Sequence, residues 1–223
     1  MSSIKGRVVR LLSGVATRRA TVVAVEPIGG FQRLLLRADV QPWAAGTKVQ
    51  LLLPTDDMRT YTPVATSAGM VLLAWGRAGG PGTRWMSQAR AGDELRFVGP
   101  QRSLELAAGP AVIVGDETSL GVAAAFAAER PGQLHAVIQT DAAADVRDAA
   151  ASVGLRQVAT VAAGDTASTV DAVIAARSSA PGAVVAVTGR SGLVADVRDA
   201  LRRAGVQNLK TKTYWIPGKT GLD

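Results

Sequence analysis

The first hundred residues place short apolar runs between polar and turn-forming residues. Runs of this length, bounded by Pro, Gly and Asp, predict β-strands. Six strands are predicted on this basis, at 20–28, 31–39, 47–54, 59–65, 69–76 and 93–99. The intervening segment 79–93 predicts a glycine-rich loop and a short helix, with Thr83 as its N-cap. Six short strands at this spacing predict a small antiparallel β-barrel or β-sandwich.

From about residue 109 the apolar pattern changes to an alternation of strands and helices. Strands are predicted at 109–115, 134–140, 156–161, 182–189 and 208–215, and helices at 118–130, 142–154, 165–179 and 191–205. Such an alternation forms a parallel sheet with helices on both faces. Ligands of these sheets bind at the carboxyl ends of the strands. The sequence therefore predicts two domains, with the boundary between 100 and 109.

The amino-acid composition excludes several kinds of catalytic and metal-binding site. The 223 residues are 48% hydrophobic, which is enough for a core in each of two small domains. Because cysteine is absent, disulfides, thiolate metal sites, cysteine nucleophiles and cysteine-ligated iron–sulfur clusters are excluded. One histidine, His135, cannot build a multi-histidine metal site, and no metal site is predicted. Redox chemistry would therefore need a bound organic cofactor or a redox-active substrate.

The sequence predicts neither a signal peptide nor a membrane span. No stretch approaches the roughly 18 apolar residues of a spanning helix, and the N-terminal apolar pieces are too short for a signal. The first dozen residues are expected to form an amphipathic helix or an arm. The expected compartment is the cytoplasm.

The formal net charge is +7, from 25 Lys and Arg against 18 Asp and Glu. A surplus of this size suits nucleic acid, but the arginines are scattered and aromatic residues make up only 4% of the chain. No nucleic-acid partner is therefore predicted. Phosphorylated cofactors or an anionic small substrate would use the same positive charge.

The segment RTYT, residues 59–62, offers a guanidinium, a phenol and a hydroxyl within four positions. Arg59 and Tyr61 share one face of a strand, an arrangement that suits a flat, phosphorylated ligand or a half-solvated edge strand. The segment GGPGTRW opens a helix, so the free backbone N–H groups of Thr83, Arg84 and Trp85 favour a phosphate there. A flexible turn is the alternative.

The turn VGDETSLG, residues 114–121, follows a predicted strand but is not a GxGxxG phosphate-binding motif. Asp116 and Glu117 would repel a phosphate at the start of the helix, for which Thr118 or Ser119 is the expected cap. From the residues alone, the turn is expected to act as an acidic cap of its own helix.

Four segments, RTYT (59–62), 79–100, VGDETSLGVAAA (114–125) and TYWIPG (213–218), resemble the siderophore-interacting protein family. These are FAD-dependent ferric-siderophore reductases among the ferredoxin-reductase-like flavoenzymes. The resemblance implies an FAD-binding, six-stranded antiparallel β-barrel over 1–105 and an NAD(P)H-binding-type α/β domain over 106–223. It also implies reduction of a ferric siderophore with electrons from NAD(P)H or a ferredoxin-like donor.

The resemblance assigns roles to individual residues. Arg59 would hold the flavin diphosphate, Tyr61 would pack against the ribityl chain or ring, and Thr62, the candidate catalytic residue, would hydrogen-bond near the flavin N5. The amides around Gly82, Thr83, Arg84 and Trp85 would form a second phosphate grip, which favours FAD over FMN. The resemblance also implies that the turn at Asp116 and Thr118 faces the flavin and the nicotinamide pocket, with the acidic cap as the alternative. The remaining expected cofactor contacts are Arg190, Tyr214 and Trp215, and for the last two the alternative is interdomain packing.

The sequence departs from the family pattern at Val64, where a second arginine is usual, at Trp75, where histidine is usual, and at Arg190, which replaces an acid. Arg190, with Ser191 and Arg198, is a candidate for the 2′-phosphate of NADPH. Lys48, Lys210 and Lys212 are candidates for binding an anionic ferric chelate, with solvated surface as the alternative. A general NAD(P)H:flavin reductase and a non-catalytic binding protein remain alternative functions.

Overall fold

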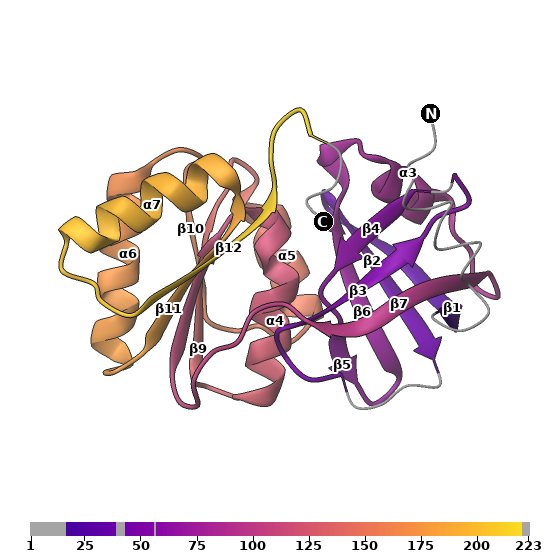
Figure 1. Cartoon of the computed structure of the whole chain (residues 1–223), viewed down its shortest axis with the longest axis horizontal. Coiled ribbons are helices and arrows are strands. Elements are labelled where there is room, and N and C mark those ends of the chain that lie inside the picture. Colours follow the sequence, from indigo (N-terminus) through magenta and orange to yellow (C-terminus); the bar gives the residue numbers. More distant parts are fainter. Residues whose placement is uncertain (1–16, 39–42, 56, 220–223) are drawn as a thin grey trace.

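The computed structural model describes residues 17–38, 43–55 and 57–219. The predicted N-terminal helix or arm lies outside these residues. Two bodies lie side by side along the molecule (Figure 1): a curled β-sheet built from the first half, called the barrel here, and an α/β body built from the second. The segment predicted as the domain boundary, 100–109, begins within the last strand of the barrel, which ends at Arg102, and leads to the first strand of the α/β body at Ala111.

The barrel is antiparallel, as predicted. In its described part the sheet has seven strands rather than six, in the order β4-β3-β7-β1-β2-β6-β5. Their bounds are β1 Arg18–Ile28, β2 Phe31–Ala38, β3 Thr47–Leu52, β4 Met58–Tyr61, β5 Val64–Thr66, β6 Gly69–Trp75 and β7 Glu94–Arg102.

The extra strand arises because the predicted run 59–65 breaks into β4 and β5. Pro63 lies at the break, and proline has no N–H to continue a ladder. β4 and β5 occupy the two edges of the sheet although only Thr62 and Pro63 separate them. The sheet must therefore curl until its two edge strands lie close together. Thr62 lies in the short connection between these edges.

Alternate side chains of the strands fill the barrel interior. Leu34, Leu36, Leu51, Leu72 and Phe97 are all fully buried, as expected for strands with one face on a core. The helix α3, Pro81–Gln88, follows the 3-10 turn η1, Gly76–Ala78, and closes one end of the barrel with Met86.

The α/β body has the predicted parallel sheet, in the order β10-β9-β8-β11-β12 over the described residues. The bounds are β8 Ala111–Gly115, β9 Leu134–Gln139, β10 Val158–Val161, β11 Val184–Arg190 and β12 Leu209–Trp215. The connecting elements are η2 Glu117–Ser119, α4 Leu120–Glu129, α5 Ala143–Ser152, α6 Thr166–Ser179 and α7 Ser191–Arg203.

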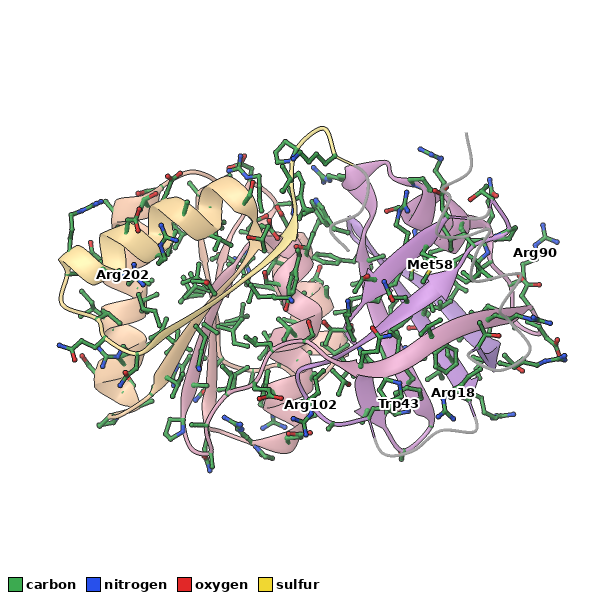
Figure 2. The ribbon with its side chains drawn as sticks, in the orientation of Figure 1. Arg18, Trp43, Met58, Arg90, Arg102 and Arg202 are labelled. Atoms are coloured by element: carbon green, nitrogen blue, oxygen red, sulfur yellow. The ribbon has the colours of Figure 1, made fainter. Side chains whose placement is uncertain are left out.

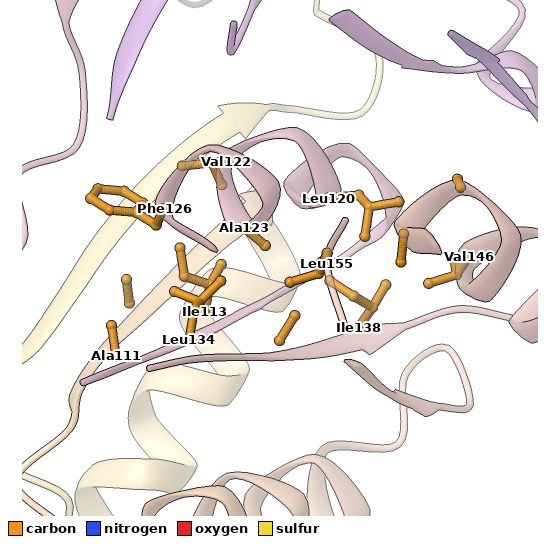
Figure 3. Packing of buried hydrophobic residues seen from close by; sticks show 14 of the residues in the cluster. Ala111, Ile113, Leu120, Val122, Ala123, Phe126, Leu134, Ile138, Val146 and Leu155 are labelled. Atoms are coloured by element: carbon orange, nitrogen blue, oxygen red, sulfur yellow. The ribbon is translucent and has the colours of Figure 1, made fainter. Parts of the chain in front are cut away.

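Helices cover both faces of this sheet. On one face, Leu120, Ala123 and Phe126 of α4 pack over Ile113 and Leu134 (Figure 3), and α5 joins the same cluster. On the other face, α6 and α7 pack against β8 and β11. The apolar strands β8 and β11 are thus buried on both sides.

The two bodies are packed together through apolar side chains. Val64 of β5 contacts Ala124 and Ala125 of α4, and Phe31 of β2 belongs to the core cluster of the α/β body.

The arginines are spread over the molecule, with Arg90 and Arg202 at its opposite ends (Figure 2). Among the described helices, none has the length and apolar character that a membrane crossing requires.

Candidate functional site

A cavity of about 690 Å³ lies between the barrel and the α/β body. Its volume falls within the range of about 300–1,000 Å³ that is usual for ligand and cofactor sites. The wall contributed by the α/β body includes the carboxyl ends of β11 and β12 and the turn after β8, where the sequence predicted a ligand. Of the predicted site residues, the cavity lining includes Lys48, Arg59, Tyr61, Thr62, Gly82, Thr83, Asp116, Thr118, Arg190, Tyr214 and Trp215.

Arg59 and Tyr61 form the barrel side of the cavity from β4. Arg59 Nη1 donates a hydrogen bond to the Met58 carbonyl at 2.7 Å and lies 3.7 Å from Asp57 Oδ1. Burial raises the pKa of Tyr61 to about 12, and the charge of Arg59 opposes that shift. The phenol of Tyr61 is therefore neutral at physiological pH and can serve as a flat surface with one donor.

Gly82 lies directly against these two side chains. A Cβ at this position would be 2.2 Å from the Tyr61 hydroxyl and 3.1 Å from Arg59 Cγ. Only glycine lets the start of α3 approach β4 so closely, and this approach brings the backbone of the helix to the cavity.

The start of α3 differs from the prediction. The helix begins at Pro81 with Gly80 as its N-cap, so the expectation that Thr83 is the cap is wrong. Proline suits the first helical position because it lacks the N–H that would be unpaired there. The Arg84 amide donates to the Gly80 carbonyl at 3.0 Å and so is not free, contrary to expectation. The amides of Gly82 and Thr83 occupy the first turn, where intrahelical partners are lacking.

Arg84 and Trp85 are not brought to the cavity. The guanidinium of Arg84 donates to the Gly79 carbonyl, and Trp85 lines a separate cavity of about 550 Å³ on the barrel. Each helical residue turns by about 100°, so Arg84 and Trp85, which follow Thr83 by one and two positions, face other directions. The hydroxyl of Thr83, by contrast, donates to the Trp75 carbonyl at 3.2 Å.

Asp116 organises the opposite wall. Its carboxylate accepts hydrogen bonds from the Thr118 amide at 3.0 Å, the Arg190 amide at 2.8 Å and Trp215 Nε1 at 3.0 Å, and also from the Thr118 hydroxyl. Asp116 thus caps η2 with its side chain. Ser119, one of the two expected caps, occupies the N-cap position of α4 but makes no capping hydrogen bond with its side chain. A Cβ at Gly189 would lie 2.8 Å from this carboxylate. Asp116 therefore ties together the ends of β8, β11 and β12.

Both interpretations of the acidic turn hold at once, because Asp116 caps η2 and also lines the cavity. Glu117 lies beside it and accepts a hydrogen bond from the Thr140 hydroxyl at 2.7 Å. Ser119 is fully buried and accepts from the Thr188 hydroxyl at 2.8 Å. The turn is consequently held in place by the ends of its neighbouring strands.

Tyr214 and Trp215 complete the wall at the end of β12. Burial raises the pKa of Tyr214, and nearby Asp116 raises it further, while hydrogen bonding with Thr62 and Thr188 acts in the opposite direction. Tyr214 therefore stays protonated beside Thr62, which belongs to the barrel. Trp215 is 38% exposed at the cavity.

The remaining candidates separate into two groups. Arg190 and Lys48 line the cavity, whereas Lys210 and Lys212 lie on β12 outside its lining. Arg198, proposed to assist Arg190, donates from Nε to Asp199 at 2.8 Å. Neither Ser191 nor Arg198 belongs to the lining of this cavity.

The structure shows the surroundings of two residues that depart from the family pattern. Val64 is 1% exposed and packs against α4. Trp75 lines the cavity, and the centre of its ring lies 4.7 Å from the centre of the Phe31 ring.

Sequence reasoning missed several lining residues. Gln139 is the last residue but one of the predicted strand 134–140 and ends β9, so its place near a carboxyl end could have indicated it. It donates to the Thr169 hydroxyl at 2.9 Å. Arg77 follows a predicted strand in η1 and also lines the cavity. The sequence around Arg77 carries no comparable signal.

The residues of the cavity fit a flat ligand that carries phosphate. Described lining residues include the cations Lys48, Arg59, Arg77 and Arg190, against the acids Asp116 and Glu117. Tyr61, Trp75, Tyr214 and Trp215 supply aromatic surface, and the first turn of α3 supplies backbone N–H groups. Within the described residues, no cluster of three or more His, Cys, Asp or Glu could hold a metal ion.

Comparisons with known proteins identify the fold. No protein-family model matches the sequence, and no curated protein matches it. Solved structures do match. The siderophore-interacting protein SipS from Aeromonas hydrophila superposes with a TM-score of 0.67 at 22% identity, covering 92% of this chain and 93% of that one.

Two reductases are also similar. Cytochrome P450 reductase GcoB from Amycolatopsis matches with a TM-score of 0.65 at 24% identity, over 91% of this chain and 71% of that one. Ferredoxin-NADP+ reductase from Plasmodium falciparum matches with a TM-score of 0.65 at 8% identity, over 89% and 96%. The chain therefore has the ferredoxin-reductase-like fold, and the predicted resemblance to siderophore-interacting proteins is confirmed at the level of the fold.

Proposed function

We propose that the protein is an FAD-dependent ferric-siderophore reductase of the cytoplasm, which takes electrons from NAD(P)H or a ferredoxin-like protein. The observation that carries this proposal is the composition of the cavity between the two bodies. One wall offers Arg59, Tyr61 and the start of α3, and the other offers the carboxyl end of a parallel sheet. The shared fold with siderophore-interacting proteins supports it.

The barrel wall would hold the flavin. Arg59 would bind one phosphate through charge-assisted hydrogen bonds, and the amides of Gly82 and Thr83 would bind another. Two phosphate-binding groups, a guanidinium and a pair of backbone amides, suit a diphosphate. The proposed cofactor is therefore FAD, which has two phosphates, and not FMN, which has one. A bound flavin supplies the conversion between two-electron and one-electron transfer.

The other residues would place the reactants. Neutral Tyr61 offers a flat surface for the ring system, and the Thr62 hydroxyl, held beside Tyr214, would donate to a ring nitrogen. Trp215 would limit the access of water. Arg190 and Thr118, on the α/β wall, would bind the nicotinamide donor, and Arg190 is proposed to select the 2′-phosphate of NADPH.

The substrate would be ferric iron held by hard oxygen ligands, which ferrous iron binds more weakly. Each hydride from NAD(P)H carries two electrons, so one donor molecule would reduce two ferric chelates and release one proton. Lys48, at the cavity, is proposed to attract the anionic chelate. Lys210 and Lys212 are proposed only as a more distant part of this positive surface.

Absorbance of the purified protein at about 450 nm, followed by anaerobic reoxidation of the reduced flavin, tests the proposal. A yellow protein whose reduced flavin is reoxidised faster by a ferric siderophore than by ferricyanide or oxygen would support it. A colourless protein that takes up no added FAD would contradict it and would favour a non-catalytic binding protein.

A general NAD(P)H:flavin or electron-transfer reductase is the second candidate. The similar folds of a P450 reductase and a ferredoxin-NADP+ reductase favour it, as do the departures at Val64 and Trp75. In that case reoxidation by the ferric siderophore would be no faster than by the other acceptors.

A further inference from the structure

Arg77 is a lining residue of the cavity that the proposed flavin site does not yet use. Its Nη2 lies 3.1 Å from Asp145 Oδ2 on α5, and its guanidinium lies 5.6 Å from the centre of the Trp75 ring. The side chain is 67% exposed. It is nevertheless held by two contacts, one with the barrel and one with the α/β body, and so it has a defined direction at the mouth of the cavity.

Asp145, the partner of Arg77, is itself fixed. Its side chain is 19% exposed and packs beneath the turn between β1 and β2. A Cβ at Gly29 would lie 2.5 Å from Asp145 Oδ1, and a Cβ at Gly30 would lie 2.9 Å from Oδ2. The two glycines thus allow the turn to rest directly on the carboxylate, which has little freedom to swing away from Arg77.

The ion pair leaves donors of Arg77 available. A guanidinium has five N–H donors in a rigid fork, and the contact with Asp145 involves Nη2. Asp145 does not belong to the lining of the cavity, whereas Arg77 does. The geometry therefore suits a side chain anchored at one edge by the α/β body and offering its other edge to a ligand.

Arg77 also lies next to the other anion-binding groups of the barrel. It precedes the first turn of α3 by a few residues, and the Thr83 hydroxyl binds the Trp75 carbonyl, which ties η1 to that turn. Arg59 reaches the same turn at Gly82. A phosphate bound by the Gly82 and Thr83 amides would consequently have cations of two different elements nearby.

We propose that Arg77 is a further cofactor-binding residue that contacts a phosphate of the flavin, and that Asp145 positions it from the other body. The inference rests on the proposed flavin site. The two phosphates of FAD carry two negative charges, of which Arg59 alone would compensate one. Arg77 supplies the second guanidinium, at a position unrelated in sequence to the first.

The test is a fluorescence-quenching titration of wild-type protein, Arg77→Gln and the control Arg84→Gln with FAD and with riboflavin, which has no phosphate. Arg77→Gln is expected to weaken FAD binding by about tenfold, as for loss of one hydrogen bond to a charged group. It should leave riboflavin binding unchanged. Arg84→Gln should change neither, because Arg84 lies outside the cavity lining.

Unchanged FAD affinity in Arg77→Gln, or an equal loss for both flavins, would overturn the inference while the flavin site stands. A loss of NADPH affinity alone would assign Arg77 to the donor and would also overturn it. Wild-type protein that binds neither flavin would overturn the proposed function and the inference together.

The positioning role of Asp145 is tested by a double-mutant cycle with Asp145→Asn, which keeps the size of the side chain. If Asp145 acts through Arg77, the double variant should bind FAD as weakly as Arg77→Gln alone. Additive losses would show that Asp145 affects binding independently of Arg77 and would contradict the positioning role.

Discussion

The two walls of the cavity use their polar groups in different ways. On the barrel wall, the phenol of Tyr61 and the first-turn amides of α3 face the cavity without filling it. On the α/β wall, the carboxylate of Asp116 is occupied by donors from its own turn and from the ends of two other strands. The barrel wall thus presents groups of the kind that the proposed ligand needs, whereas the α/β wall uses its carboxylate to keep its own strand ends in place.

This difference has a physical consequence for the proposed function. Cofactor affinity should depend mainly on the barrel, whereas rigidity of the cavity should depend on the network around Asp116. A network with its hydrogen bonds already satisfied has few groups left for a tightly bound cofactor. It suits a nicotinamide donor that must bind and leave.

The largest effect on the barrel wall is expected from Gly82→Val. The new side chain would overlap the Tyr61 hydroxyl, 2.2 Å from the Cβ position, and would push α3 away from β4. FAD affinity should fall by more than about a hundredfold, and overpacking should cost about 1–3 kcal/mol of unfolding free energy. Gly80→Ala is the control, since a Cβ there has no described atom within 4 Å. Equal losses in both variants would contradict the close approach.

A direct comparison of the walls uses Arg59→Ala and Arg190→Ala. Arg59→Ala should weaken FAD binding by roughly ten- to a hundredfold, as expected for a lost charge-assisted phosphate contact. Arg190→Ala should leave FAD affinity nearly unchanged but reduce the preference for NADPH over NADH. Equilibrium titration and steady-state kinetics measure the two. Full flavin occupancy in Arg59→Ala, or an unchanged nucleotide preference in Arg190→Ala, would remove the respective assignment.

Asp116→Asn should reveal how far the α/β wall depends on its carboxylate. In either orientation the amide NH₂ would face donors. At the Oδ2 position it would meet the Arg190 amide and the Trp215 indole, and at the Oδ1 position the Thr118 amide. Urea denaturation should show a loss of about 1–3 kcal/mol, typical of an unsatisfied buried group. Asp165→Asn is the matched control, because Asp165 also caps a helix through its side chain and asparagine caps equally well. A similar loss at Asp165 would contradict the special role of Asp116.

The smallest effect concerns the pH dependence of stability. Tyr61 has a pKa of 10.0 in the unfolded chain and about 12 when folded, because burial disfavours the phenolate. Its contribution is complete below about pH 10 and is lost as pH rises through about 12, since the unfolded state releases the proton first. As the pH rises from about 9 to 11.5, the free energy of unfolding of Tyr61→Phe should therefore increase by about 1–2 kcal/mol relative to that of the wild type. A constant difference between the two proteins across this range would contradict the buried phenol.

The fold followed from the sequence because the apolar periodicities were clear. The strand split at Thr62 and Pro63 was visible in principle, since proline cannot continue a ladder. The same holds for the start of α3, where Pro81 marks a first helical position. Both errors came from giving a run of apolar or polar residues more weight than a single proline.

The site could be predicted only in part, because a cavity depends on the packing of distant segments. Lys210 shares a strand with Trp215, yet five residues along a strand span about 16 Å, which places Lys210 away from the carboxyl end. Arg77 reaches the cavity through contacts with Trp75 and with Asp145 on a helix of the other body. No local pattern could reveal that pairing.

The cavity between the two bodies is proposed to bind a flavin dinucleotide through its barrel wall. Calorimetric titration of FAD into the apoprotein, repeated with Arg59→Ala, measures this binding. We expect one FAD per chain, with binding strongly weakened in the variant. Absence of FAD binding to the wild-type protein, or binding that Arg59→Ala leaves unchanged, would contradict it.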